Sequence, residues 1–151
     1  MNGQSSEAAY LEESLAELER ALGHLEYSAG ACPTTLGADG CSEAQLVEIE
    51  AFTSRFARVV DLLSKRVLRA IDQFEMYEPG TLLDVANRAE KRGLIGSVEW
   101  LRELKGTRNE ISHDYAGSRL SELLVYCHEE LPELIESCRR TLGYGRQLVQ
   151  R

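Results

Sequence analysis

One arginine stands where the helical pattern of the sequence predicts an apolar side chain. In the segment 98–115, apolar residues recur at intervals of three and four, and Arg108 takes one of these positions between Leu104 and Ile111. Burying a charge without a partner is costly, so the guanidinium must reach solvent, pair with a carboxylate, or face a cleft where an anion binds. Guanidinium groups bind carboxylates and phosphates through paired N–H donors, which makes Arg108 a candidate anion-binding residue.

A histidine follows Arg108 by five residues, at position 113. Histidine is the side chain whose unperturbed pKa allows it to take or give a proton near neutral pH. On an ideal helix, five residues turn His113 about 140° away from Arg108, so the two side chains of one chain do not point at the same atom. Either the helix ends or bends at this point, or two chains bring their segments together.

Arg108, Asn109, His113 and Tyr115 stand in the order Arg-Asn-x-x-x-His-x-Tyr. This order resembles the signature of the HEPN superfamily, the higher eukaryote and prokaryote nucleotide-binding domains, and most of all its HepT branch. The motif covers eight residues, just before the last long predicted helix. The helical pattern of nearly the whole chain fits the same fold, although Gly106 weakens the helix in the turn before the motif.

The resemblance implies a homodimer whose motif helices face each other across a two-fold axis and form a metal-independent endoribonuclease site. Arg108 and His113 would be catalytic and Asn109 supportive. Proteins of this kind are toxins that pair with a minimal nucleotidyltransferase antitoxin, which can transfer AMP to the motif tyrosine, here Tyr115. The implied partners are RNA, a second copy of the chain and the nucleotidyltransferase. Neither a cofactor nor a metal ion is implied.

The residue types agree with this chemistry. Cleavage of RNA without metal uses the ribose 2′-hydroxyl as nucleophile, and histidine can remove its proton. Arginine can stabilise the negative charge that the phosphorane-like transition state gains. A two-fold axis would supply two histidines, one as base and one as acid. AMP on Tyr115, which shares a helical face with Arg108, would place a phosphate beside the arginine and inhibit the site directly.

Each motif residue also has an ordinary structural interpretation. Arg108 can be a salt-bridged or solvent-reaching arginine, His113 a solvated residue near a helix end, and Tyr115 a core residue with a hydrated hydroxyl. Two other functions therefore stay open. The chain can be a non-catalytic nucleotide- or substrate-binding subunit of a minimal nucleotidyltransferase, or a helical interaction protein in which the motif arises by chance.

Further basic and histidine residues carry weaker signals. Lys65, Arg66 and Arg69 form a basic stretch that is either a solvated helix face or a track for RNA. His24 and His128 have no partner at a meaningful spacing, and we expect both at the surface.

The elements that must position the motif are helices. Apolar periodicity predicts helices over 7–27, 42–76, 81–93 and 97–115, and a last long one from about 118. Ser42, Thr81 and Ser97 are expected to cap three of them. Residues 28–42 are predicted to be a loop, and Pro132 to kink the last helix. The prediction is one all-α domain over 1–151, an up-and-down bundle of four to five helices.

Composition excludes several classes of protein. The net charge is −8, but residues 1–50 alone carry −9, so an anionic ligand elsewhere is not excluded. A strongly basic nucleic-acid binder is not indicated. The longest apolar run has five residues, and the N-terminal residues lack the pattern of a secretory signal, so we expect a cytoplasmic protein without a membrane segment.

The four cysteines do not predict a metal site. Cys127 and Cys138 share a helical face and are expected in the core, while Cys32 and Cys41 flank the predicted loop and are expected as free thiols. No histidine or second cysteine stands at the spacing that zinc requires.

Overall fold

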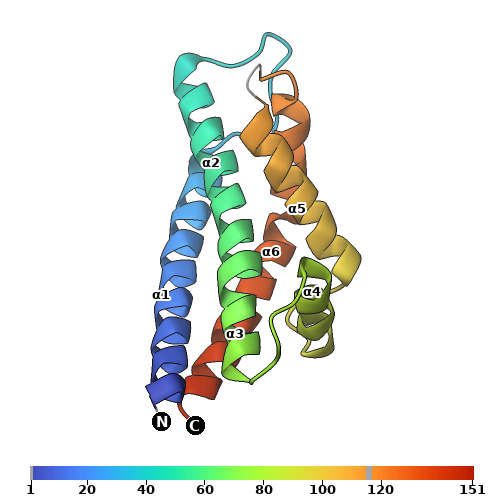
Figure 1. The fold of residues 1–151 in the computed structure, drawn as a ribbon. Helices are drawn as coiled ribbons and strands as arrows, with labels where there is room; N and C mark the ends of the chain where they lie inside the picture. Colours follow the sequence, from blue (N-terminus) through green and yellow to red (C-terminus); the bar gives the residue numbers. More distant parts are fainter. Residues whose placement is uncertain (1, 115–116) are drawn as a thin grey trace.

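The chain folds into a bundle of helices, and the computed structural model describes residues 2–114 and 117–151. The elements in chain order are α1 (Asn2–Ala31), α2 (Glu43–Asp61), the π-helical segment η1 (Leu62–Val67), α3 (Leu68–Phe74), α4 (Leu82–Lys91), α5 (Val98–His113) and α6 (Leu120–Val149). These ranges include no strand. Figure 1 shows both ends of the chain at the same end of the bundle. The predicted all-α bundle is confirmed.

Helix α1 is longer at both ends than the predicted range 7–27. Its core face carries the expected stripe of buried leucines, at positions 11, 15, 18, 22 and 25. The additional turn at its C-terminal end is held from α2, because the Arg55 guanidinium donates to the hydroxyl of Ser28 at 2.6 Å and to the carbonyl of His24 at 3.2 Å. A contact from a distant segment therefore extends the helix into the predicted loop.

The second predicted helix is one continuous run made of three segments. Ser42 caps it as expected, because its hydroxyl accepts from the Gln45 N–H at 3.1 Å and the Gln45 side chain accepts from the Ser42 N–H at 3.0 Å. In the middle, α2 changes into the π-helical segment η1 and then into α3. In Figure 1 the run from α2 to α3 lies beside α1 along the length of the bundle.

Helix α3 ends in a turn that places Met76 in the left-handed region, with φ of 67°. The Tyr77 N–H donates to the carbonyl of Asp72 at 2.9 Å, and the Met76 N–H donates to that of Gln73 at 3.0 Å. These two bonds define a Schellman ending, in which glycine is the usual residue at this position. The chain then turns into α4, which Thr81 caps as predicted.

Helices α5 and α6 complete the bundle. Ser97 caps α5 as predicted, accepting from the Trp100 N–H at 3.1 Å. Helix α6 continues as one element through Pro132. The core lies between α1, the α2–α3 run and the inner faces of α5 and α6, and Cys127 and Cys138 are fully buried in it as expected. None of the helices in the described ranges has both the length and the apolar character to span a membrane.

Candidate functional site

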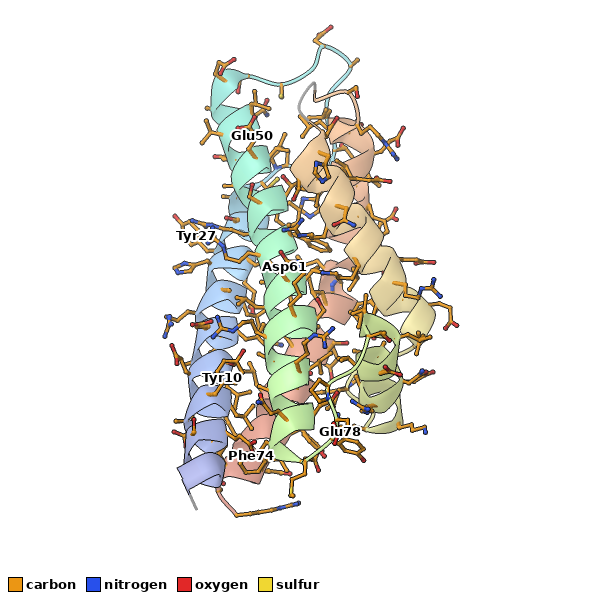
Figure 2. The ribbon with its side chains drawn as sticks, in the orientation of Figure 1. Tyr10, Tyr27, Glu50, Asp61, Phe74 and Glu78 are labelled. Atoms are coloured by element: carbon orange, nitrogen blue, oxygen red, sulfur yellow. The ribbon has the colours of Figure 1, made fainter. Side chains whose placement is uncertain are left out.

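Arg108 lies on the face of α5 that packs against α2, and it pairs with a carboxylate there. Its Nε donates to Asp61 Oδ2 at 2.8 Å, and its Nη2 lies 2.7 Å from the same oxygen. About a quarter of each side chain is exposed, 26% for Arg108 and 24% for Asp61. Of the three alternatives for a charge at this position, pairing with a carboxylate is observed, and Arg108 also lines a groove between α2 and α5. Figure 2 labels Asp61 midway along the run from α2 to α3.

Two lysines share the same carboxylate. Lys105, one turn before Arg108, donates to Asp61 Oδ1 at 3.2 Å and is only 13% exposed, while Lys65 Nζ lies 3.6 Å from that oxygen. Partial burial alone raises the pKa of the Asp61 carboxyl, but the hydrogen bonds from Arg108 and Lys105 outweigh it and hold that pKa below its ordinary value. Burial lowers the pKa of Lys105 more than Asp61 raises it. Three cations around one carboxylate leave a local excess of positive charge.

Asp61 is the last residue of α2, directly before the π-helical segment. Such segments are frequent at functional sites because they locally change which residues face a neighbouring helix. Sequence reasoning did not single out Asp61, which is separated from Arg108 by 47 residues. The sequence indicated that Arg108 could pair with a carboxylate. Because the chain has many carboxylates, this signal did not identify Asp61.

A groove of about 510 Å³ runs between α2 and α5 beside this ion pair. Its polar lining consists of Ser54, Arg58, Asp61, Arg108 and Ser112. Its apolar lining consists of Ala57, Leu62 and Ile111. Among the described residues, no hydrogen bond engages Nη1 of Arg108. The groove therefore presents N–H and O–H donors together with apolar surface, which suits an anion attached to an organic group.

His113 is the last residue of α5 and is exposed. The helix ends directly after it, since Asp114 has φ of −86° and ψ of 61°. This was one of the alternatives for the geometry of the motif. His113 is not among the residues that line the groove with Arg108, so one chain alone does not bring the two side chains into one cavity. Tyr115, the predicted modification site, lies outside the described residues.

Asp114 organises the corner between α5 and α6. Its carboxylate accepts from the Arg119 N–H at 3.1 Å and from the Ser118 hydroxyl at 3.3 Å. Arg119 also bridges to Glu110 of α5 at 3.2 Å. Gly117 has φ of 68°, a conformation that favours glycine. These contacts fix the end of the motif helix against α6, and sequence reasoning missed the role of Asp114.

The supporting residue Asn109 is exposed on α5 and does not line the groove. Its neighbour Glu110 contributes to the corner through Arg119. The structure therefore separates the motif into an inner part, Arg108 in the groove, and an outer part, Asn109 and His113 at the surface.

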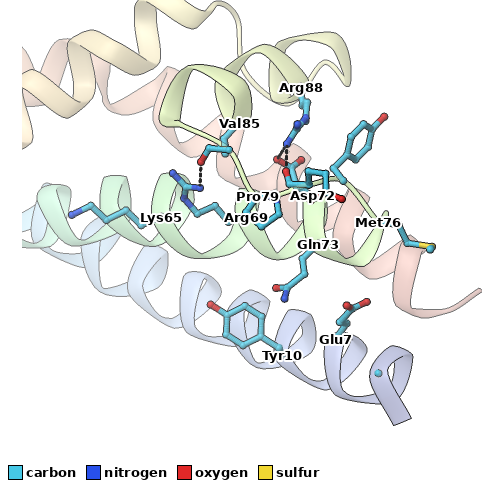
Figure 3. A pocket seen from close by; sticks show the side chains of 14 residues that line it. Glu7, Tyr10, Lys65, Arg69, Asp72, Gln73, Met76, Pro79, Val85 and Arg88 are labelled. Atoms are coloured by element: carbon cyan, nitrogen blue, oxygen red, sulfur yellow. Dashed lines mark hydrogen bonds and ion pairs between the residues drawn. The ribbon is translucent and has the colours of Figure 1, made fainter. Parts of the chain in front are cut away.

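The three basic residues Lys65, Arg66 and Arg69 of the long run contact different partners. Lys65 and Arg69 line a larger cavity of about 690 Å³, shown in Figure 3, between α1, α3 and the segment 76–80. Arg69 donates to the carbonyl of Gly80 at 2.8 Å. Arg66 pairs with Glu17 at 3.2 Å. Two of the three possible RNA-binding residues thus hold neighbouring segments together, and Lys65 is the most exposed, at 57%.

The expectation that His128 lies at the surface is wrong. Its ring stacks on Phe52 with 4.3 Å between the ring centroids, and Nε2 lies 3.0 Å from the carbonyl oxygen of Pro33. The half-buried His128 therefore connects α6 to the segment after α1. His24 is exposed as expected.

All four cysteines are free thiols, as expected. Burial raises the pKa of Cys32 to about 11 and that of Cys127 to about 12. Within residues 2–114 and 117–151, histidine, cysteine and acidic side chains form no group that could hold a metal ion.

Comparison of the chain with protein-family models, curated proteins and solved structures gave no match.

Proposed function

We propose that the protein is a metal-independent endoribonuclease, acting as the toxin of a toxin–antitoxin pair. The observation that carries the proposal is the position of Arg108, which lies in a groove with excess positive charge, on the helix that ends at His113. Arg108 and His113 both belong to the Arg-Asn-x-x-x-His-x-Tyr order, which resembles the signature of the HepT branch of the HEPN superfamily.

In the proposed reaction His113 removes the proton of a ribose 2′-hydroxyl. The oxygen attacks the adjacent phosphorus, the bond from phosphorus to the 5′-oxygen breaks, and the products are a 2′,3′-cyclic phosphate and a 5′-hydroxyl. The leaving oxygen takes a proton from a second acid, for which a homodimer supplies the same histidine of the other copy. Arg108 stabilises the charge on the phosphoryl oxygens in the transition state.

Asp61 has a positioning role in this proposal. It engages Nε and Nη2 of Arg108, while Nη1 forms no hydrogen bond within the described residues. Nη1 is thus the donor available to a phosphoryl oxygen. Lys105 and Lys65 balance the charge of Asp61, so the carboxylate does not repel the substrate.

A homodimer is part of the proposal, because His113 and Arg108 of one chain do not line one groove. We propose that two copies bring their motif helices together, so that each site combines groups of both. The antitoxin would be a minimal nucleotidyltransferase that transfers AMP to Tyr115.

The experiment is cleavage of single-stranded RNA by the purified protein in EDTA. The expected products carry 2′,3′-cyclic ends, and a substrate with 2′-deoxyribose at the cleaved position is expected to stay intact because it lacks the nucleophile. Cleavage that requires a divalent cation, or that also cuts the deoxy substrate, would contradict the proposal.

A second candidate is a non-catalytic subunit that presents a nucleotide or substrate to a minimal nucleotidyltransferase. The observation that favours it is that Asp61 already occupies one edge of Arg108 while His113 lies outside the groove. This candidate predicts that the protein with unmodified Tyr115 binds nucleotide or RNA but does not cleave RNA in EDTA.

A further inference from the structure

The groove between α2 and α5 has matching polar residues on its two walls. On α2, Ser54 and Arg58 are four residues apart, and on α5, Arg108 and Ser112 are four apart. Residues at this spacing lie one above the other on a helix face. Each wall therefore offers one hydroxyl and one guanidinium to the same groove. Helices α2 and α5 run in opposite directions (Figure 1).

Arg58 lines this groove, and no described polar contact ties its side chain to the fold. It is exposed, and no hydrogen bond or ion pair links its side chain to any described residue. It also borders a second hollow between α1 and α2, which the carboxylate of Glu17 lines as well, but Glu17 pairs with Arg66 at 3.2 Å. Among the described residues that line the groove, Asp61 is the one carboxylate, and it is shared by Arg108, Lys105 and Lys65.

We infer that Arg58 is a substrate-binding residue that contacts a phosphate of single-stranded RNA next to the phosphate at Arg108. The inference rests on the proposed function and extends it to the substrate strand. Two guanidiniums in one groove fit a chain with successive phosphates better than a lone anion. The hydroxyls of Ser54 and Ser112 can bind the ribose or phosphate oxygens. Ala57, Leu62 and Ile111 offer apolar surface to the sugar and base.

The role assigned to Arg58 is in binding and not in bond cleavage. Asp61 fixes the orientation of Arg108, whereas no described contact fixes Arg58, so Arg58 can follow a flexible strand. A phosphate contact of this kind is independent of base sequence and is weakened by salt. Arg58 should therefore contribute to affinity for RNA of any sequence.

The test measures binding of a fluorescently labelled single-stranded RNA to full-length protein in EDTA, in a His113→Ala background that prevents cleavage. The variants are Arg58→Gln, Arg58→Lys and Arg102→Gln. Arg102 is the matched control, since it is exposed on α5, does not line the groove, and loses the same charge. Circular dichroism checks that each variant keeps its helices.

We expect Arg58→Gln to weaken binding about tenfold relative to Arg102→Gln, the loss expected for a charged hydrogen bond. The slope of log affinity against log salt should decrease by roughly 0.7, the value for one phosphate contact on a single strand. Arg58→Lys should keep most of the slope because it keeps the charge.

Equal affinities and equal slopes for Arg58→Gln and Arg102→Gln would overturn the role of Arg58. The proposed nuclease would stand in that case if the wild-type protein cleaves RNA in EDTA. If the His113→Ala parent bound no RNA and the wild type cleaved none, both the inference and the proposed function would be wrong.

Discussion

Asp61 of α2 and Arg108 of α5 are joined through a single carboxylate oxygen, with Nε at 2.8 Å and Nη2 at 2.7 Å. Lys105 occupies the other oxygen at 3.2 Å. The pair therefore connects the end of α2 to the motif helix and also sets the direction of the guanidinium. Stability and the geometry of the candidate site depend on the same contact.

Asp61→Asn is expected to lower the free energy of unfolding by about 1–3 kcal/mol, because Arg108 and Lys105 lose a charged acceptor in a partly buried place. Urea unfolding measures this change. Asp39→Asn is the control, since Asp39 is exposed in the segment between α1 and α2 and its substitution should change stability by less than about 0.5 kcal/mol. Equal effects of the two substitutions would show that the contact contributes no net stability.

The contribution of Asp61 should also depend on pH. Its pKa in the folded protein lies below the ordinary value of 3.8, so the unfolded chain takes up the proton first as pH falls. The stabilisation is therefore complete above pH 3.8 and decreases as pH falls through the lower folded pKa. The difference in unfolding free energy between wild type and Asp61→Asn should shrink in this acid range. A difference that stays constant there would contradict the assignment.

Local signals made most of the fold predictable. Ser42, Thr81 and Ser97 cap their helices as expected, since a cap depends on residues three positions away. The π-helical segment was not predictable, because the helical spacing of apolar residues continues through it without a break. For the site, the need of Arg108 for a partner could be predicted, but not the identity of Asp61. His128 was misjudged for the same reason, since its partners Phe52 and Pro33 are distant in sequence.

Met76→Gly is expected to stabilise the protein. Met76 has φ of 67° and the residue is 82% exposed, so it adds strain with little packing. Glycine relieves the strain of the left-handed conformation, but it also gives the unfolded chain more conformational freedom. The free energy of unfolding should therefore rise by about 0.5–1 kcal/mol. Thermal or urea unfolding measures it. Met76→Ala should give no such gain, and an equal gain for both variants would point to the side chain and not to the backbone.

The thiols should differ in reactivity. Cys32, Cys127 and Cys138 are buried, whereas Cys41 is partly exposed. Burial raises the pKa of all three buried thiols, so little thiolate forms near neutral pH. A thiol reagent should therefore modify one group per chain rapidly under native conditions and all four in denaturant. The rapid phase should vanish in Cys41→Ser, and its persistence in that variant would contradict the described burial.

The central claim is tested most directly by RNA cleavage in EDTA with substitutions on the enzyme side. His113→Ala should slow cleavage by about 10²- to 10⁴-fold, the contribution of a general base, and Arg108→Ala should also abolish most activity. His24→Ala is the matched control, because His24 is exposed on α1 and does not line the groove with Arg108, so this variant should keep wild-type activity. Wild-type rates in His113→Ala, or equal losses in His113→Ala and His24→Ala, would contradict the proposed catalytic site.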